Sequence, residues 1–440
     1  MNPRLLPAFL ALLLSVVLGL GLSALGSQQR PSLSGVTVTG THSVVCPVMD
    51  PALVTTTVRA AAGGGARARL IGESETRPVP ASGVPATRPD PYVVVGDQTV
   101  AGIATGAAGG GPMRGLWLAS CGAATVEQVF PGLVSDADHR SFLVLTNPDP
   151  NQATVDISLY GSRGRIQAQG SRGVTVLGNS SRLVALEPLV TDKDPLTAVV
   201  RTSAGRVFSY ARVEGQGGAD WVTSAAPAAT SGIITGIPGG SGARTLVLAN
   251  PGDRRTTVTV EAMTQNGSFA PAGADQVDVS AESTVTVALD KALLGETAGL
   301  RIRSTQPVTG AVWAATADGT DLAVASTRRP FAGRSVLPVV PGGVLTVSNA
   351  GGQEAPLTLT VRDSSGAVIE QSTQAVPAGT TQQLPLTTGD TVQVDSPSDQ
   401  VGIAVVSTGA QDRPGLGIAP LGPGGLAEAE FSPQVDPALA

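Results

Sequence analysis

The segment "SDADHRS" (135–141) holds the side chains whose types and spacing could best do chemistry. Asp136, Asp138 and His139 lie close together in it. Carboxylates at alternate positions can bind Ca²⁺, and a His–Asp pair can transfer a proton. The ligand series of an EF-hand is absent, however. These three residues are therefore weak candidates for a metal site, and the simpler interpretation is a polar loop that leads into a strand.

Other catalytic arrangements are missing from the sequence. A serine or cysteine nucleophile needs a base within reach, and the chain has only two histidines, His42 and His139. It contains no G-x-S-x-G elbow, no P-loop and no Rossmann glycine motif. The 34 acidic residues are spread along the chain, so no glycosidase-like carboxylate pair stands out. We predict that the protein is not an enzyme and has no cofactor.

Cys46 and Cys121 are the only cysteines of the chain. They form no C-x-x-C motif and no Cys/His cluster, which argues against a metal or redox site. Two buried free thiols are one interpretation, and a disulfide in an oxidising compartment is the one we predict. Such a bridge would stabilise the fold by about 4–5 kcal/mol in the chain-entropy model.

The N-terminus indicates export. After "MNPR" comes an uncharged apolar stretch at 5–25, which is long enough to cross ~30 Å of hydrocarbon. We predict a signal anchor over 1–30, so that the protein is single-pass in the cell membrane with residues after about 26 outside. A signal peptide cleaved near Ala24-Leu25-Gly26, which would give a secreted protein, is the alternative.

Net charge limits the range of partners. The formal net charge is −6 and only 14% of residues are charged. Nucleic-acid binding needs clustered Lys and Arg, so we predict no nucleic-acid partner. The abundant glycine and proline are typical of many short strands joined by tight turns.

Three segments of the chain align without a gap: "LVLTNPDPNQATVDISLYGSRG", "LVLANPGDRRTTVTVEAMTQNG" and "LTVSNAGGQEAPLTLTVRDSSG". Each begins with a strand that ends at an asparagine, continues with alternating apolar residues and ends at a glycine. The alternation predicts strands with one buried face, and asparagine and glycine suit turns. The asparagines are Asn147, Asn250 and Asn349, and the glycines are Gly164, Gly267 and Gly366.

The likeness extends downstream into hairpins at 176–186, 279–289 and 376–386 and then into closing strands. The region before these copies matches as a degenerate fourth one, which begins near "SVVCPV" and closes with "GLWLASCG". We therefore expect an all-β protein of tandem immunoglobulin-like β-sandwich domains after an N-terminal transmembrane helix. Their ranges are 36–126 (first copy), 127–225 (second), 233–327 (third) and 335–410 (fourth), followed by a disordered tail at 411–440.

Aromatic residues are few, and two of them are candidates for a binding surface. Tyr160 lies in the outward phase of its strand, and Trp221 precedes a predicted linker. Exposed rings of this kind can stack on sugars. Trp117 and Trp313 lie in strands where core packing is the simpler interpretation.

The strand pattern resembles that of bacterial exported immunoglobulin-like repeats. The chain as a whole is similar to an uncharacterised actinobacterial family of unknown function, most specifically through "WLASCG" and "SDADHRSFLVLTNPDP". This resemblance implies a membrane-anchored or secreted envelope protein and brings no catalytic residues.

Two functions follow from these expectations. The first is a non-enzymatic cell-envelope protein, an anchored rod of sandwiches that scaffolds or binds a protein or glycan partner. The second is an enzyme or subunit of cell-wall or polysaccharide assembly that uses the 135–141 loop.

Overall fold

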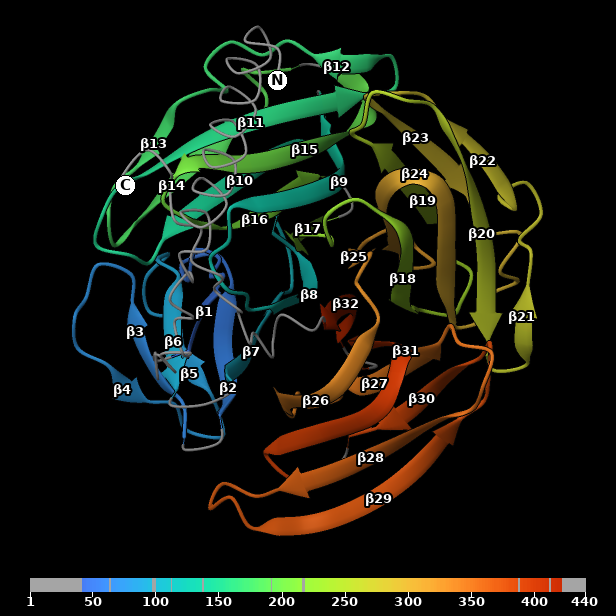
Figure 1. Ribbon diagram of the computed structural model, residues 1–440. Coiled ribbons are helices and arrows are strands. Elements are labelled where there is room, and N and C mark those ends of the chain that lie inside the picture. Colours follow the sequence, from blue (N-terminus) through green and yellow to red (C-terminus); the bar gives the residue numbers. More distant parts are fainter. Residues whose placement is uncertain are drawn as a thin grey trace, which may run out of the picture. The chain divides into compact units, whose positions relative to one another are not determined.

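The computed structural model describes residues 42–421, apart from short gaps at 63–64, 97–99, 112, 137, 191, 216–217, 387 and 411–412. All regular elements of this part are β-strands, which confirms the predicted all-β class (Figure 1). No helix among these residues has the length and apolar character needed to span a membrane. The predicted anchor at 1–30 lies outside the described residues.

The second copy shows the plan that the others follow. Its two sheets are antiparallel and share one hydrophobic core, to which Leu143 and Leu145 contribute from one side and Val155 and Ile157 from the other. One sheet has the order β14 (Ser180–Ala185), β10 (Arg140–Asn147), β16 (Phe208–Gly215) and β17 (Gly218–Thr223). In the other, β12 (Gly164–Ile166) and β13 (Val174–Val176) pair with β11 (Ala153–Gly161), followed by β15 (Asp192–Ala204) and β9 (Glu127–Ser135).

The third and fourth copies repeat this order. In the third copy, one sheet has the order β23 (Ser283–Ala288), β19 (Arg244–Asn250), β24 (Ala298–Ala315) and β25 (Leu322–Ser326). In the other sheet, β21 (Gly267–Phe269) and β22 (Gln276–Val279) both pair with β20 (Thr256–Thr264), which is followed by β24 and β18 (Ala229–Ile237). In the fourth copy, one sheet has the order β30 (Thr381–Pro385), β27 (Val344–Asn349), β31 (Thr391–Ala410) and β32 (Arg413–Leu421). The other sheet has the order β29 (Val368–Val376), β28 (Ala355–Arg362), β31 and β26 (Phe331–Pro338). The long strands β24 and β31 each pair first in one sheet and then in the other.

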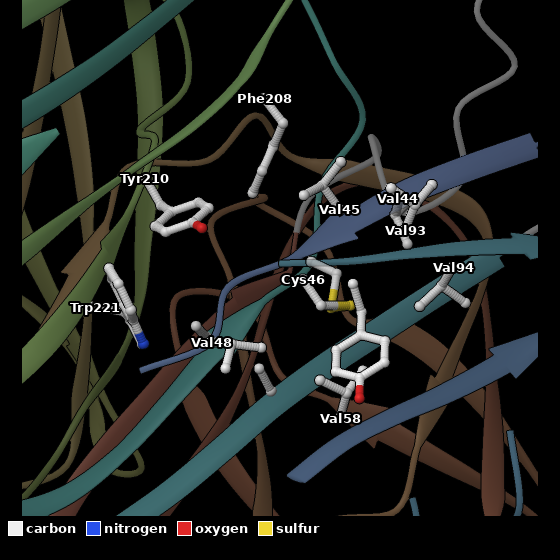
Figure 2. Close-up of a cluster of buried hydrophobic side chains, with 14 of the residues drawn as sticks. Val44, Val45, Cys46, Val48, Val58, Val93, Val94, Phe208, Tyr210 and Trp221 are labelled. Atoms are coloured by element: carbon white, nitrogen blue, oxygen red, sulfur yellow. A yellow bond between two sulfur atoms is a disulfide. The ribbon is translucent and has the colours of Figure 1, made fainter. Parts of the chain in front are cut away.

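The first copy departs from this plan. Its first sheet has the order β1 (His42–Cys46), β6 (Tyr92–Gly96), β3 (Arg67–Leu70) and β4 (Arg77–Pro78). Its second sheet has the order β5 (Val84–Pro85), β2 (Thr55–Ala62), β7 (Val100–Ala108) and β8 (Gly115–Ser120). No ladder joins β1 to β7. Instead, the predicted disulfide between Cys46 and Cys121 is present and joins β1 to the end of β8 (Figure 2). Gly102 of β7 packs on it, because a Cβ there would lie 2.6 Å from Sγ of Cys121.

The three repeated asparagines are fully buried and have the same role in each copy. The side-chain amide of Asn250 donates to the carbonyl of Arg254 at 2.7 Å and to that of Ser280 at 3.0 Å, and its Oδ1 accepts the N–H of Gly252 at 3.0 Å. Asn147 and Asn349 make the equivalent bonds to residues two and four positions ahead. The recurring asparagine therefore closes the turn between two strands of opposite sheets, because it satisfies buried backbone groups there.

The turns that were predicted at the repeated glycines are also confirmed. Gly164, Gly267 and Gly366 have φ angles of 116°, 126° and 84°, which only glycine adopts readily. The hairpins at 176–186, 279–289 and 376–386 turn at Asn179, Glu282 and Gly379, again with positive φ.

Neighbouring copies are joined by a bond that recurs. Thr284 Oγ1 of the third copy donates to the carbonyl of Tyr160 in the second at 2.8 Å. Thr381 Oγ1 of the fourth copy donates to the carbonyl of Met263 in the third, also at 2.8 Å. The Ser/Thr pair that marks each hairpin in the sequence thus provides a hydrogen bond between copies as well as a turn.

The closing strands of all four copies contact one another. β8 contacts β17 and β32, and β25 contacts the same two strands. The hydrophobic clusters follow this order, since each of the four large clusters mixes side chains of two copies, and the last joins Ile103 and Leu118 of the first copy to the core of the fourth. An extended rod is therefore the wrong description, because the first and fourth copies are in contact.

The prediction of a disordered tail from 411 onwards is wrong for its first part. β32 pairs with β31 and buries Leu416, Ile418 and Ala419. Its glycines hid the strand pattern, and they are needed for close approach: a Cβ on Gly417 would lie 2.4 Å from the side chain of Leu118 and 2.9 Å from its backbone nitrogen. Residues 422–440 lie outside the described part.

Candidate functional site

The 135–141 loop forms the turn between β9 and β10. Oδ1 of Asp136 accepts the backbone N–H of Asp138 at 2.8 Å and that of His139 at 2.7 Å. It also lies 3.0 Å from Nδ1 of His139. These hydrogen bonds, with the N–H of Asp138 the strongest, lower the pKa of Asp136 below its usual range. The three predicted residues thus come together, but Asp136 acts as the cap of a turn.

The loop provides little of what a metal needs. Within the part of the chain that the structure describes, no three His, Cys, Asp or Glu side chains gather where they could hold an ion. His139 is exposed and packs on Gly215, where a Cβ would lie 2.5 Å from its Cδ2 atom. A Ca²⁺ site requires six or more oxygen ligands, and the oxygen best placed to bind it already accepts two backbone bonds.

Beside this loop lies a charged cluster that the sequence did not reveal. Glu214 is 8% exposed and forms ion pairs with Arg140 at 2.9 Å and with Arg212 at 2.8 Å. The guanidinium of Arg212 lies 4.7 Å from the centre of the Phe142 ring. Arg140 pairs with Glu214 across two strands, so only the register of β10 and β16 could have indicated the cluster. A carboxylate shared by two arginines favours a structural role over a reaction.

Tyr160 and Trp221 are both buried, with 4% and 2% of their surface exposed. Trp221 lies beside Tyr210 (Figure 2) and packs edge-on against its ring, with ring centres 4.7 Å apart. It also packs edge-on against Trp117 of the first copy, with ring centres 6.3 Å apart. Tyr160 packs against Val199 in a small cluster near the third copy. The prediction that these two rings form a binding surface is therefore wrong, because a neighbouring copy covers the face that would otherwise meet water.

The closing strands meet around a buried carboxylate, Asp321, which is 2% exposed. One of its oxygens accepts the N–H of Leu116 in the first copy and the N–H of Leu416 in the fourth, both at 2.8 Å. The other accepts the N–H of Leu322 at 2.9 Å. A Cβ on Gly115 would lie 2.2 Å from this carboxylate, so that position must be glycine. One side chain thus joins three copies.

Asp220 is a second acid in these strands and is completely buried. Its Oδ1 accepts the N–H of Trp221 at 2.7 Å, while its Oδ2 has no hydrogen-bond partner. Burial, reinforced by the charge of Asp321, raises the pKa of Asp220 well above its usual value. Burial also raises the pKa of Asp321, to about 6, against the opposing effect of its three N–H donors.

Arg328 is the matching cation in the same region. It donates to the carbonyl of Ser224 and to Oγ1 of Thr223 in the second copy, and to the carbonyl of Pro420 in the fourth. Burial lowers the pKa of its guanidinium to about 10, so it remains charged at neutral pH. Asp321 and Arg328 both belong to the end of the third copy, and together they bond to the other three.

Neither residue could be identified from the sequence, because "GTDLAV" and "STRRP" look like ordinary turns and linkers. Their arrangement places buried charge where it holds strands together. Perturbed carboxyl pKa values can mark an active site. Here, however, both acids are enclosed by the strands that they join, and no substrate could reach them without separation of the copies.

Comparison with known protein families gives a match over most of the chain. The model of a family of unknown function, DUF5719, matches residues 94–387, well over half of the 440-residue chain. No curated protein matches the chain. The match confirms the resemblance to an uncharacterised family that the sequence indicated, and the chain belongs to this family of unknown function, DUF5719.

Proposed function

We propose that this chain is a non-enzymatic, exported protein of the cell envelope, whose four immunoglobulin-like β-sandwich modules act together as one scaffold. In this proposal an N-terminal segment anchors it in the membrane, or is cleaved to release it. The modules present an outer surface to a protein or glycan partner of the envelope. The protein needs no cofactor and no metal for this role.

The observation that carries the proposal is the use made of buried charge. Asp321 accepts backbone N–H groups from two other copies, and Arg328 donates to carbonyl groups of two. Buried charges are costly unless they are paired or hydrogen-bonded. A chain that places such groups between its modules keeps four copies as one body, which is what a scaffold requires.

The disulfide supports the proposed location. Cys46 and Cys121 are bonded, and disulfides persist mainly in oxidising compartments outside the cytosol. The apolar segment at 5–25 is the matching signal for export. Both features are expected of a protein that works on the outer side of a membrane.

Fractionation of the producing cells tests this proposal. We expect the full chain in the membrane or the medium, sensitive to protease added to intact cells, with Cys46 and Cys121 resistant to alkylation. Mass analysis of the mature N-terminus separates anchoring from cleavage near Ala24. Chemical crosslinking in intact cells should then connect the chain to envelope components. A cytoplasmic chain with free thiols would refute the proposal.

The alternative is an enzyme or subunit of cell-wall or polysaccharide assembly that uses the 135–141 loop. The 3.0 Å contact between Nδ1 of His139 and Oδ1 of Asp136 is the observation in its favour. The double substitution Asp138→Ala/His139→Ala tests it, with Asp318→Ala as a control at another exposed turn. We expect both variants to fold and to preserve envelope integrity. Loss of envelope integrity in the double variant alone would favour the enzyme.

A further inference from the structure

Phe269 is the one aromatic ring among the described side chains that is exposed, at 38% of its surface. The other aromatic rings whose exposure the structure describes are buried or half-buried. An exposed aromatic ring presents a flat apolar face on which a ligand can pack. Phe269 is the last residue of the short edge strand β21.

Phe269 lies at a notch in the sheet edge of the third copy. Both β21 and β22 pair with β20, and the loop 270–275 between them leaves the middle of β20 partly uncovered. The notch has a volume of about 280 Å³. Its lining consists of Thr259, Val260, Glu261, Phe269, Ala270, Asp275 and Gln276.

The polar wall of the notch is held in place. Glu261 accepts two hydrogen bonds from Arg301, whose Nη1 also donates to the carbonyl of Ala350 in the fourth copy at 2.7 Å. The N–H of Val260 donates to the carbonyl of Asp275 at 3.2 Å. Burial alone would raise the pKa of Glu261, but the bonds from Arg301 and Ser268 outweigh it and lower that pKa. Glu261 is therefore an ionised acceptor at neutral pH.

The equivalent places in the other repeated copies lack this combination. The residue that corresponds to Phe269 in the second copy is Ile166, which packs against the core of that copy. In the fourth copy it is Val368, and there the single strand β29 pairs along the whole of β28 with one register shift beside Val368, so no loop interrupts the edge. The aromatic ring, the gap and the acceptors coincide only in the third of these three aligned segments.

We propose that this notch binds one neutral sugar unit of a glycan. The proposal rests on the envelope function above and names the chemistry of its partner. The apolar face of a pyranose would lie on the Phe269 ring, while its hydroxyls donate to the carboxylates of Glu261 and Asp275 and exchange hydrogen bonds with the Gln276 amide. Pockets for drug-sized ligands begin near ~300 Å³, so this one suits a single ring. No Lys or Arg lines the notch, and its two carboxylates disfavour anionic sugars.

Binding of the full chain to immobilised oligosaccharides, measured by biolayer interferometry, tests this proposal. The probes are tetramers of galactose, mannose, arabinose, glucose and N-acetylglucosamine, with tetragalacturonic acid as the anionic counterpart. We expect at least one neutral tetramer to bind. Phe269→Ala should weaken that binding about tenfold, as expected for the loss of an aromatic anchor worth ~1.4 kcal/mol.

Three further variants separate the notch from the rest of the surface. Phe269→Tyr keeps the ring and should bind within about threefold of the parent chain. Asp275→Asn removes an exposed acceptor charge without a change in packing and should also weaken binding. Val368→Ala is the matched control, because it truncates the equivalent exposed residue where no notch exists.

Equal affinities of Phe269→Ala and Val368→Ala would overturn the proposal, as would tightest binding of tetragalacturonic acid or no binding of any neutral tetramer. None of these results would affect the envelope function itself, which depends on fractionation and crosslinking. A chain that is found outside the cytoplasm and crosslinks to envelope components equally well with and without Phe269 would keep its proposed function and lose its proposed sugar site.

Discussion

Substitution of Asp321 by alanine should destabilise the contact among the copies. The change leaves three buried backbone N–H donors without an acceptor, those of Leu116, Leu416 and Leu322. An unsatisfied buried donor costs roughly 1 kcal/mol or more. Removal of a buried carboxylate offsets part of this cost. We therefore expect a loss of about 3 kcal/mol in the free energy of unfolding at neutral pH.

The pH dependence of this loss gives a sharper test. The pKa of Asp321 is about 6 in the folded chain and 3.8 is its ordinary value. An acid whose folded pKa is raised binds its proton more tightly when folded, so its contribution to stability is complete below pH 3.8 and declines as the pH rises to about 6. The difference between these two pKa values corresponds to roughly 3 kcal/mol in the free energy of unfolding. The cost of Asp321→Ala should thus be larger near pH 4 than near pH 7.

Asp363 provides the matched control. Its Oδ1 accepts the backbone N–H groups of Ser365 at 2.9 Å and Ala367 at 3.0 Å. Unlike the donors to Asp321, these two residues lie in the same exposed hairpin as the carboxylate that they bind. The hydroxyl of Ser365 contributes most to lowering the pKa of Asp363, so its stabilising effect is lost as the pH falls. Asp363→Ala should therefore cost less than Asp321→Ala, and its cost should shrink towards acid pH.

Urea denaturation followed by tryptophan fluorescence measures both variants, since Trp117 and Trp221 lie buried where the first two copies meet. A chain of this size can unfold in more than one step, so the number of transitions is itself a result. We expect Asp321→Ala to split the transition and Asp363→Ala to leave it unchanged. Equal losses for the two variants, or a cost of Asp321→Ala that falls towards pH 4, would refute the reasoning.

Three further predictions concern the stability of the fold, and urea denaturation measures each. Replacement of Cys46 and Cys121 by alanine should cost about 4–5 kcal/mol, and an unchanged midpoint would show that the bridge is dispensable. Asn250→Ala removes three buried hydrogen bonds and should cost about 2–4 kcal/mol, whereas Asn151→Ala, at an exposed position, should cost less than about 0.5. Gly417→Ala should cost about 1–3 kcal/mol, because its Cβ would collide with β8; a neutral effect would place β32 elsewhere.

Local chemistry explains what could be predicted from the sequence. The buried positions of Val258 and Val260 follow from alternation, and the turns at Gly267 and Asn250 follow from backbone preferences of single residues. The disulfide followed from an even pair of cysteines in a chain whose N-terminus predicts export. Each of these inferences needs only residues that are near in sequence, or a count.

Contacts between copies could not be predicted in this way. Period-two alternation assigns Tyr160 to the face of its strand that points away from its own core, but it does not say that a neighbouring copy covers that face. Asp321 looks like a turn residue until the strands of three copies surround it. The notch at Phe269 depends on a gap between two short edge strands, and the lengths of such strands are poorly determined by sequence.

The bond between Ser120 and Pro420 has a consequence for the order of folding. Oγ of Ser120 donates to the carbonyl of Pro420 at 2.7 Å, across a separation of 300 residues. Because the chain is synthesised from its N-terminus, β8 of the first copy lacks this partner until β32, the last strand, has been made. Contacts between residues so distant in sequence also form slowly. The cysteine bridge spans only 75 residues and can form long before that moment. The bridge therefore stabilises the first module during the interval before its last contact forms, and this would protect the growing chain from misassembly.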